Sequence, residues 1–203
     1  MPRIRFGTEG WRAVLADDYT FDNLRAVARA TGRWFARQPR RAPVAVGHDT
    51  RFLGDRFAAA AADELAECGL ETKLCTGHLP TPAVAYYVIA EKLAGAAVLT
   101  ASHNPAEWNG FKIKDPTGAP GAPDNVKWIG DEANRILDGE PPPAPRSAST
   151  SASTSRTPTS TASSPSLTAR QSHAPSSPSS PTSCTVPDAA TLTRCFAGSA
   201  APR

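Results

Sequence analysis

The apolar residues of this chain are concentrated in its first 140 positions, and this uneven distribution decides where a folded core can form. The last 60 residues, 144–203, include 45 that are Ser, Thr, Pro or Ala, and Phe196 is their only aromatic residue. Such a segment buries too little apolar surface to offset the entropy cost of ordering it. We therefore divide the chain into one domain over residues 1–140 and a low-complexity tail over residues 141–203, which we expect to be disordered.

Two explanations of this tail stay open. Its richness in Ser, Thr, Pro, Ala and Arg, with almost no acidic residues and no Lys or Ile, fits an out-of-frame reading of a G+C-rich gene. We favour this frameshift because the composition changes abruptly after a well-patterned helix. The alternative is a genuine disordered segment that is phosphorylated or binds a partner.

The charge of the chain excludes several classes of function. Residues 1–143 carry 17 Lys and Arg against 18 Asp and Glu, so the formal charge of +3 comes from the tail, which has five Arg and one acid. A nucleic-acid or membrane-surface binder needs a clustered basic face, and we expect neither partner. No apolar run is long enough to span a membrane, and the first residues contain charges rather than an apolar signal region. We expect a cytoplasmic protein.

The four cysteines, Cys68, Cys75, Cys184 and Cys195, are divided between the domain and the tail. Their spacing is not that of a metal site. We therefore expect neither a disulfide framework nor a zinc site.

Short apolar runs alternate with helical patterns along the first 140 residues. Strands are expected at Ile4–Phe6, Trp11–Leu15, Pro43–Gly47, Glu71–Cys75, Ala96–Thr100 and Phe111–Lys114. Helices are expected from Thr20, over Asp55–Cys68, from Thr81 to about Leu93, and over Asn125–Leu137. This alternation predicts an α/β domain with a largely parallel sheet.

The pattern also predicts the helix caps, the apolar face of the first helix and the position of three loops. Thr20 and Thr81 are expected to cap the helices that follow them, and Pro82 suits a first helical turn. The first of these helices carries one apolar face, formed by Leu24, Val27, Thr31 and Phe35. Because parallel strands end at the same edge of a sheet, the loops after Val46, Cys75 and Thr100 should lie together, where ligands gather.

The segment with the clearest chemistry is Thr100-Ala-Ser-His-Asn-Pro105, followed by Lys112. A serine hydroxyl is a weak nucleophile unless it is activated or already carries a transferable group. His103 and Asn104 offer hydrogen bonds and Lys112 offers a positive charge, which suit a phosphate on Ser102 better than an acyl group. The alternative is a polar turn after a strand.

Two further segments have both a functional and a structural interpretation. In Phe6-Gly-Thr-Glu-Gly-Trp-Arg12, the glycines either admit an anion to the backbone beside Arg12 or simply form a turn. In the segment that ends at Arg51, Asp49 and Arg51 either form an ion pair that stabilises the loop or take part directly in chemistry. We favour the ion pair.

Taken together, GTEGWR, VGHDTR, PTPA and TASHNP followed by NGFKIK resemble the N-terminal domain of the α-D-phosphohexomutases. This family includes the bacterial phosphoglucomutases and phosphomannomutases. The resemblance covers residues 3–137. It implies a single three-layer α/β/α domain with a mostly parallel mixed sheet.

The resemblance also implies a reaction. Ser102 would be carried as phosphoserine, primed by a hexose bisphosphate, and would exchange its phosphoryl group with a hexose phosphate between O1 and O6. Lys112 would act in general acid/base transfer, and His103 would assist at the phosphoserine. Arg12 and Asn104 would bind phosphate. Mg²⁺ would be expected, with Ser102 supplying one ligand through its phosphate.

The sequence departs from this family after residue 140. It has no DGDGDR metal-binding loop, no GEESG sugar-binding loop and no C-terminal phosphate-binding domain. The metal site would be incomplete, and we expect little or no mutase turnover from this chain alone. The alternative function is a stand-alone phosphosugar-binding or regulatory module. An exposed domain interface would favour self-association.

Overall fold

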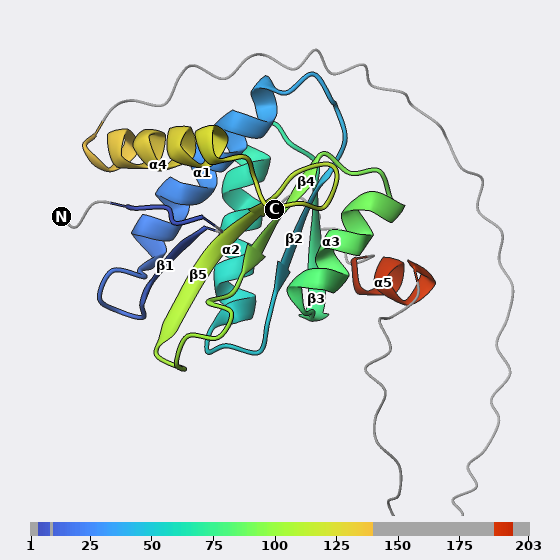
Figure 1. The fold of residues 1–203 in the computed structure, drawn as a ribbon, viewed down its shortest axis with the longest axis horizontal. Coiled ribbons are helices and arrows are strands. Elements are labelled where there is room, and N and C mark those ends of the chain that lie inside the picture. Colours follow the sequence, from blue (N-terminus) through green and yellow to red (C-terminus); the bar gives the residue numbers. More distant parts are fainter. Residues whose placement is uncertain (1–3, 9, 140–188, 197–203) are drawn as a thin grey trace, which may run out of the picture. The chain divides into compact units, whose positions relative to one another are not determined.

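In the computed structural model, which describes residues 4–8, 10–139 and 189–196, five strands form one sheet in the order β1-β5-β4-β2-β3 (Figure 1). Their bounds are Trp11–Val14 (β1), Val44–His48 (β2), Thr72–His78 (β3), Gly95–Leu99 (β4) and Trp108–Lys114 (β5). β2 pairs in parallel with β3 and β4, whereas β5 pairs antiparallel with β4 and β1. β5 therefore runs against the other four strands, and the prediction of a mostly parallel mixed sheet is confirmed.

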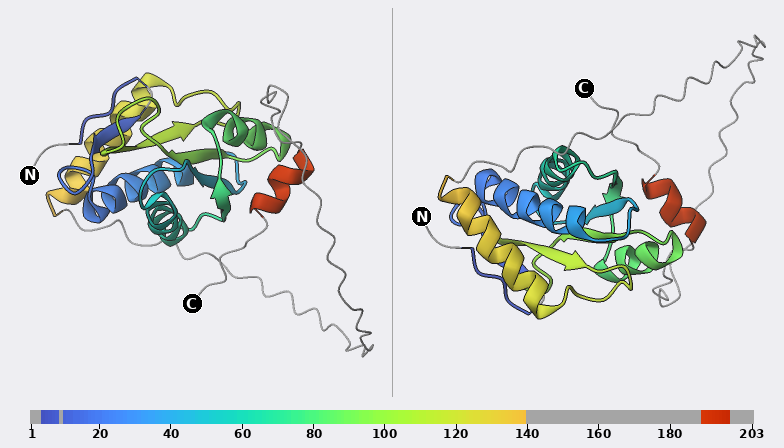
Figure 2. Two further views of the ribbon diagram at one scale, coloured as in Figure 1. Left: turned by 90° about the horizontal axis from the view of Figure 1, so that it is seen from below. Right: turned by 90° about the horizontal axis from the view of Figure 1, so that it is seen from above.

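Helices cover both faces of this sheet (Figure 2). Their bounds are Phe21–Arg37 (α1), Gly54–Glu67 (α2), Thr81–Ala90 (α3), Pro123–Leu137 (α4) and Ala189–Phe196 (α5). α1 and α2 pack on one face, with α4 against α1, and α3 packs on the other. The three-layer α/β/α architecture is confirmed.

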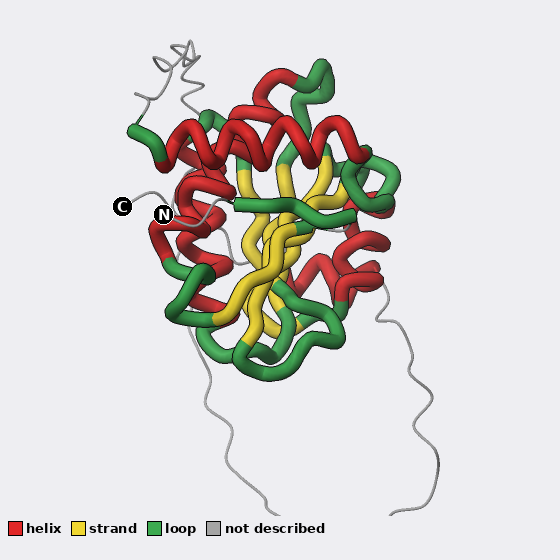
Figure 3. The backbone as a smooth tube through the Cα atoms, turned by 60° about the vertical axis from the view of Figure 1, so that its left-hand side comes forward, coloured by secondary structure: helices red, strands yellow, loops and turns green. Residues whose placement is uncertain are grey.

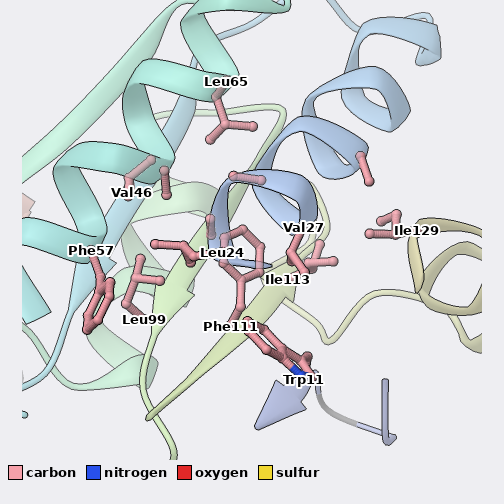
Figure 4. Packing of buried hydrophobic residues seen from close by; sticks show 14 of the residues in the cluster. Trp11, Leu24, Val27, Val46, Phe57, Leu65, Leu99, Phe111, Ile113 and Ile129 are labelled. Carbon is pink, nitrogen blue, oxygen red and sulfur yellow. The ribbon is translucent and has the colours of Figure 1, made fainter. Parts of the chain in front are cut away.

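The central strands are buried on both faces, which explains why they appear in the sequence as short apolar runs. Along β2, Val44 and Val46 face the cluster formed with α1 and α2, while Ala45 between them faces the cluster with α3. Figure 4 shows the first cluster, in which Phe111 of β5 lies close to Leu24 of α1. The alternation of side chains along each strand thus supplies two cores from one sheet.

The start of α1 follows the sequence pattern, and the start of α3 does not. Thr20 Oγ1 accepts a hydrogen bond from the Asn23 amide at 3.2 Å, so the predicted cap is confirmed. The four residues of the predicted apolar face of α1 are all buried. Thr81 is not a cap but the first helical residue of α3, because Pro80 already has the extended backbone that the capping position requires.

The predicted strand over residues 4–6 is wrong, and this segment is drawn as a loop in Figure 3. Its backbone partner is a side chain rather than a neighbouring strand. The Ile4 amide donates to Asn134 Oδ1 at 2.8 Å, and Asn134 Nδ2 donates to the Ile4 carbonyl at 2.9 Å. The side-chain amide of Asn134 therefore takes the place of the strand-to-strand hydrogen bonds that we expected for this segment.

Most of the expected disordered tail lies outside the described residues. Residues 189–196 depart from that expectation, because they form α5. Leu192 and Phe196 are spaced four residues apart and are both buried, and the Phe196 ring stacks on Tyr87 with 4.1 Å between ring centroids. Helical spacing thus gives this segment an apolar face that its overall composition hides.

None of the described helices is long and apolar enough to cross a membrane. Cys68, Cys75 and Cys195 are free thiols, so no disulfide joins the described cysteines, and Cys184 lies outside them.

Burial predicts which phenylalanine stabilises the fold. Phe111 is 0 % exposed, whereas Phe52 is 71 % exposed. We expect Phe111→Ala to lower the free energy of unfolding by about 3–5 kcal/mol, because it removes a buried ring and leaves a cavity. Phe52→Ala should change it by less than about 0.5 kcal/mol. Urea unfolding of the full chain, followed by circular dichroism, measures both. Equal effects would contradict this description of the core.

Candidate active site

An open cleft of ≈ 590 Å³ lies at the sheet edge where β2, β3 and β4 end. It is lined by Asp49 after β2, by Pro80, Thr81 and Pro82 after β3, by Thr100, Ser102 and His103 after β4, and by Lys112 and Lys114 of β5. The prediction that the three loops meet at one edge is confirmed.

Ser102 stands in this cleft with an unusual backbone. Its φ of 59° lies in the left-handed region, which costs an L residue other than Gly about 1–2 kcal/mol. The Ser102 amide donates to Thr100 Oγ1 at 2.9 Å. Its side chain is exposed, so the strained conformation is not imposed by tight packing around the hydroxyl. The surrounding hydrogen bonds must therefore maintain it.

The carboxylate of Asp49 organises the residues behind Ser102. Asp49 Oδ2 accepts from Thr100 Oγ1 at 2.5 Å, and Oδ1 accepts from the Arg51 amide at 3.2 Å. Arg51 Nε lies 3.4 Å from Asp49 Oδ2, so the predicted ion pair is confirmed. Thr100 links this carboxylate to the backbone of Ser102, since its hydroxyl both donates and accepts.

Arg51 holds a different loop from the one that we expected. Its Nη2 donates to the carbonyl oxygens of Ser102 and Asn104, at 2.9 and 2.7 Å. Its Nη1 donates to those of Pro105 and Trp108, both at 2.8 Å. The sequence suggested that Arg51 braces its own loop, but its guanidinium instead binds residues 102–108, more than fifty positions along the chain.

Lys112 approaches the same cleft from β5, opposite Val98 of β4. Lys112 is buried, with 7 % of the residue surface exposed. Lys114 also lines the cleft, although it was not among the predicted site residues. The two-residue period of β5, which places residues 112 and 114 on one face, was the available signal. Two ammonium groups beside a single carboxylate, that of Asp49, suit an anionic ligand such as a phosphate.

The remaining predicted residues are linked to this cleft in different ways. His103 lines it together with Ser102. Arg12 Nη1 donates to Asn104 Oδ1 at 3.0 Å, which ties β1 to the loop after β4. Arg12 itself lines a second cleft of ≈ 350 Å³, together with Arg5, Gly7, Thr8 and Gly10. The structure thus gathers Ser102, His103 and Lys112 in one cleft and joins Arg12 to their loop through Asn104.

Close contacts between backbones explain two glycines of the sequence motifs. A Cβ on Gly10, whose φ is +137°, would lie 2.3 Å from the Phe111 carbonyl oxygen. A Cβ on Gly110 would lie 2.6 Å from that of Thr100. For Gly10 this favours the structural interpretation over anion binding. Tyr19 supports the same region, because its hydroxyl donates to the Gly110 carbonyl at 3.0 Å.

The Tyr19 hydroxyl remains protonated in this position. Burial, with a smaller contribution from the negative charge of Asp49, raises the pKa of Tyr19 well above its ordinary value. A neutral phenol keeps its proton for the Gly110 carbonyl across the physiological pH range.

The Thr100 hydroxyl is expected to stabilise the loop measurably. Thr100→Val removes the hydrogen bond to Asp49 Oδ2 and leaves the Ser102 amide without an acceptor, and we expect a loss of about 1–3 kcal/mol in the free energy of unfolding. Thr31→Val is the matched control, because the Val27 carbonyl that accepts from Thr31 Oγ1 keeps its helical hydrogen bond. Urea unfolding compares the two variants. A larger loss for Thr31→Val would contradict the role given to Thr100.

Comparison with known sequences relates this chain to phosphosugar mutases. The family model described as phosphoglucomutase/phosphomannomutase, alpha/beta/alpha domain I matches residues 3–139. A phosphoglucosamine mutase of Clostridium acetobutylicum is 35 % identical over 135 residues, which are 66 % of this chain and 29 % of that protein. A phosphoglucosamine mutase of Natranaerobius thermophilus is 39 % identical over 118 residues, or 58 % of this chain and 26 % of that protein. The chain therefore spans less than a third of these relatives.

Solved structures extend the similarity to the fold. A putative phosphomannomutase from Thermus thermophilus is 46 % identical with a TM-score of 0.63, over 65 % of this chain and 30 % of that one. A phosphoglucomutase/phosphomannomutase family protein from Burkholderia thailandensis is 25 % identical with a TM-score of 0.55, over 66 % and 31 %.

Proposed function

This chain belongs to the phosphoglucomutase/phosphomannomutase family through its α/β/α domain I, and from that premise we propose that it is the phosphoserine-bearing domain of a hexose-phosphate mutase. The mutase is an isomerase that moves a phosphoryl group between O1 and O6 of its substrate in carbohydrate metabolism. The observation that carries the proposal is the position of Ser102. Ser102 is exposed, and its strained backbone is anchored by hydrogen bonds in a cleft that is also lined by Lys112 and Lys114.

The proposed reaction begins with a phosphoryl group on Ser102. The bond between phosphorus and Ser102 Oγ breaks as a hydroxyl oxygen of the hexose phosphate bonds to that phosphorus. Lys112 is the proposed acceptor of the proton of this hydroxyl, and Ser102 Oγ regains a proton, for which His103 is the proposed donor. The other phosphate of the resulting bisphosphate then returns to Ser102 by the same steps in reverse. Arg12 and Asn104 are proposed to bind and orient phosphate beside the serine.

The described residues do not form a magnesium site by themselves. They contain no group of three His, Cys, Asp or Glu side chains that could hold a metal ion. Among the residues lining the cleft, Asp49 is the single carboxylate, and its oxygens already accept from Thr100 and Arg51. Ser102, through its phosphate, is the one ligand that we assign to Mg²⁺.

The substrate class that we propose is a hexose phosphate, which phosphoglucosamine mutases and phosphomannomutases have in common by name. A phosphosugar-binding or regulatory module without turnover is the second candidate. We place either activity in the cytoplasm. Exposed Tyr86 and Ile89 on α3 offer a surface for self-association.

Phosphate on Ser102 separates the carrier from the binding module. We expect the full chain, incubated with a hexose 1,6-bisphosphate, to gain one phosphoryl group that peptide mass spectrometry maps to Ser102. Ser102 is the one serine among residues 1–140, which makes the assignment unambiguous there. Ser102→Ala should gain none, and Thr117→Ala, which changes an exposed hydroxyl, should behave as the unchanged chain does. Failure of the unchanged chain to accept phosphate would leave only the binding module.

Complete turnover is expected to be nearly absent. Because one domain lacks most of the positioning and charge stabilisation of the reaction, its rate should fall at least about 10³-fold below that of a full-length family member. A coupled assay that converts hexose 6-phosphate into a reduced nicotinamide signal measures this rate. Turnover close to that of a full-length enzyme would refute the expectation.

A further inference from the structure

We propose that Arg51 is a positioning residue for phosphoryl transfer, because its guanidinium holds the segment 102–108 and thereby fixes Ser102 in its left-handed conformation. This inference rests on the proposed function of Ser102. In this role Arg51 acts by binding the backbone of the Ser102 loop, in addition to its ion pair with Asp49 and without contacting the substrate.

The first argument is the geometry of the guanidinium. Each of its two terminal nitrogens donates to two carbonyl oxygens, and the four distances lie between 2.7 and 2.9 Å. The acceptors belong to residues 102, 104, 105 and 108, so the whole turn between β4 and β5 is tied to one planar group. A lysine has the same charge but a single nitrogen, and it cannot satisfy this arrangement.

The second argument is the strain at Ser102. An L residue seldom adopts a φ of 59°, and such a conformation persists only where neighbouring groups over-determine it. Arg51 binds the carbonyl of Ser102, and Thr100 Oγ1 binds its amide. Thr100 Oγ1 donates to the carboxylate of Asp49, and Arg51 is bonded to the same carboxylate through its backbone amide, with Nε 3.4 Å from Oδ2. The peptide units on either side of the strained residue are therefore held by one connected set of hydrogen bonds.

The third argument is that Arg51 stands behind the cleft. It is not among the described residues that line the cleft, and its side chain is only 12 % exposed. Its terminal nitrogens are occupied by backbone carbonyls. Loss of Arg51 should therefore change where Ser102 stands without removing a contact to the phosphate donor. The rate of transfer should fall while the affinity for the donor is kept.

A single-turnover experiment separates these effects. The full chain is mixed with a hexose 1,6-bisphosphate at several concentrations, and phosphorylation of Ser102 is followed by mass spectrometry. We expect Arg51→Lys to lower the rate at saturating donor about 10- to 100-fold, as misplacement of a reacting atom does. The donor concentration that gives half the maximal rate should change by less than about twofold. Arg51 makes no contact with the donor, so its loss should not weaken donor binding. Arg56→Lys, at an exposed position on α2, is the matched control.

Chemical rescue by guanidinium distinguishes a positioning role of Arg51 from a general loss of stability. In Arg51→Ala, guanidinium ion at millimolar concentration should restore part of the lost rate by occupying the vacated site between the carbonyls. Ammonium ion at the same concentration and ionic strength should not restore it. Amide hydrogen exchange over residues 102–108 should accelerate in the variant and slow again with guanidinium, which reports on the loop without any donor.

The outcomes are distinguishable. If the unchanged chain takes no phosphate from the donor, the proposed function fails and this inference fails with it. If the unchanged chain is phosphorylated and Arg51→Lys reacts equally fast, only the positioning role is overturned. It is also overturned if the lost rate merely follows the fraction of unfolded protein, measured by urea unfolding of the same variants.

Discussion

Antiparallel pairing of β4 with β5 is the constraint on which the candidate site depends. The pairing sets Leu99 opposite Phe111, and the Thr100 amide donates to the Gly110 carbonyl at 3.0 Å, so the chain must reverse within a few residues. That reversal creates the turn that carries Ser102. It also returns β5 across the sheet so that Lys112 reaches the cleft. A parallel neighbour would have needed a long crossover and would have separated the two residues.

A turn of this kind needs support from elsewhere in the sheet, and β2 provides it. β2 is the neighbour of β4 on the side opposite β5, so the residues that follow it emerge beside the turn. Asp49 and Arg51 follow β2 directly, and both hydrogen bond to groups that follow β4. Strand order, rather than distance along the chain, therefore decides which side chains hold the loop that carries Ser102. Parallel neighbours supply this support because their carboxyl ends share one edge.

This dependence on strand order explains what the sequence did and did not predict. Buried strands and the Thr20 cap follow from local patterns, and both were predicted correctly. The motif around Ser102 was found because its residues are adjacent in the chain. The contact of Arg51 with residues 102–108 depends on the meeting of two strand ends and the reach of one side chain, which no local pattern contains. The bond of Asn134 to Ile4 was missed for the same reason.

The charged groups in the cleft differ in what they do. The described residues that line it offer two ammonium groups and one carboxylate, and that carboxylate is already engaged in holding the loop. Under the proposed function such a site would stabilise a phosphate on Ser102, but stabilising the ground state alone does not lower the barrier to transfer. Transfer needs groups that interact more strongly with the transition state, such as a metal ion held by free carboxylates. Under the proposed function, domain I holds the phosphoryl group in position and supplies proton transfer through Lys112 and His103, and we expect further charge stabilisation of the transition state to come from outside the described residues.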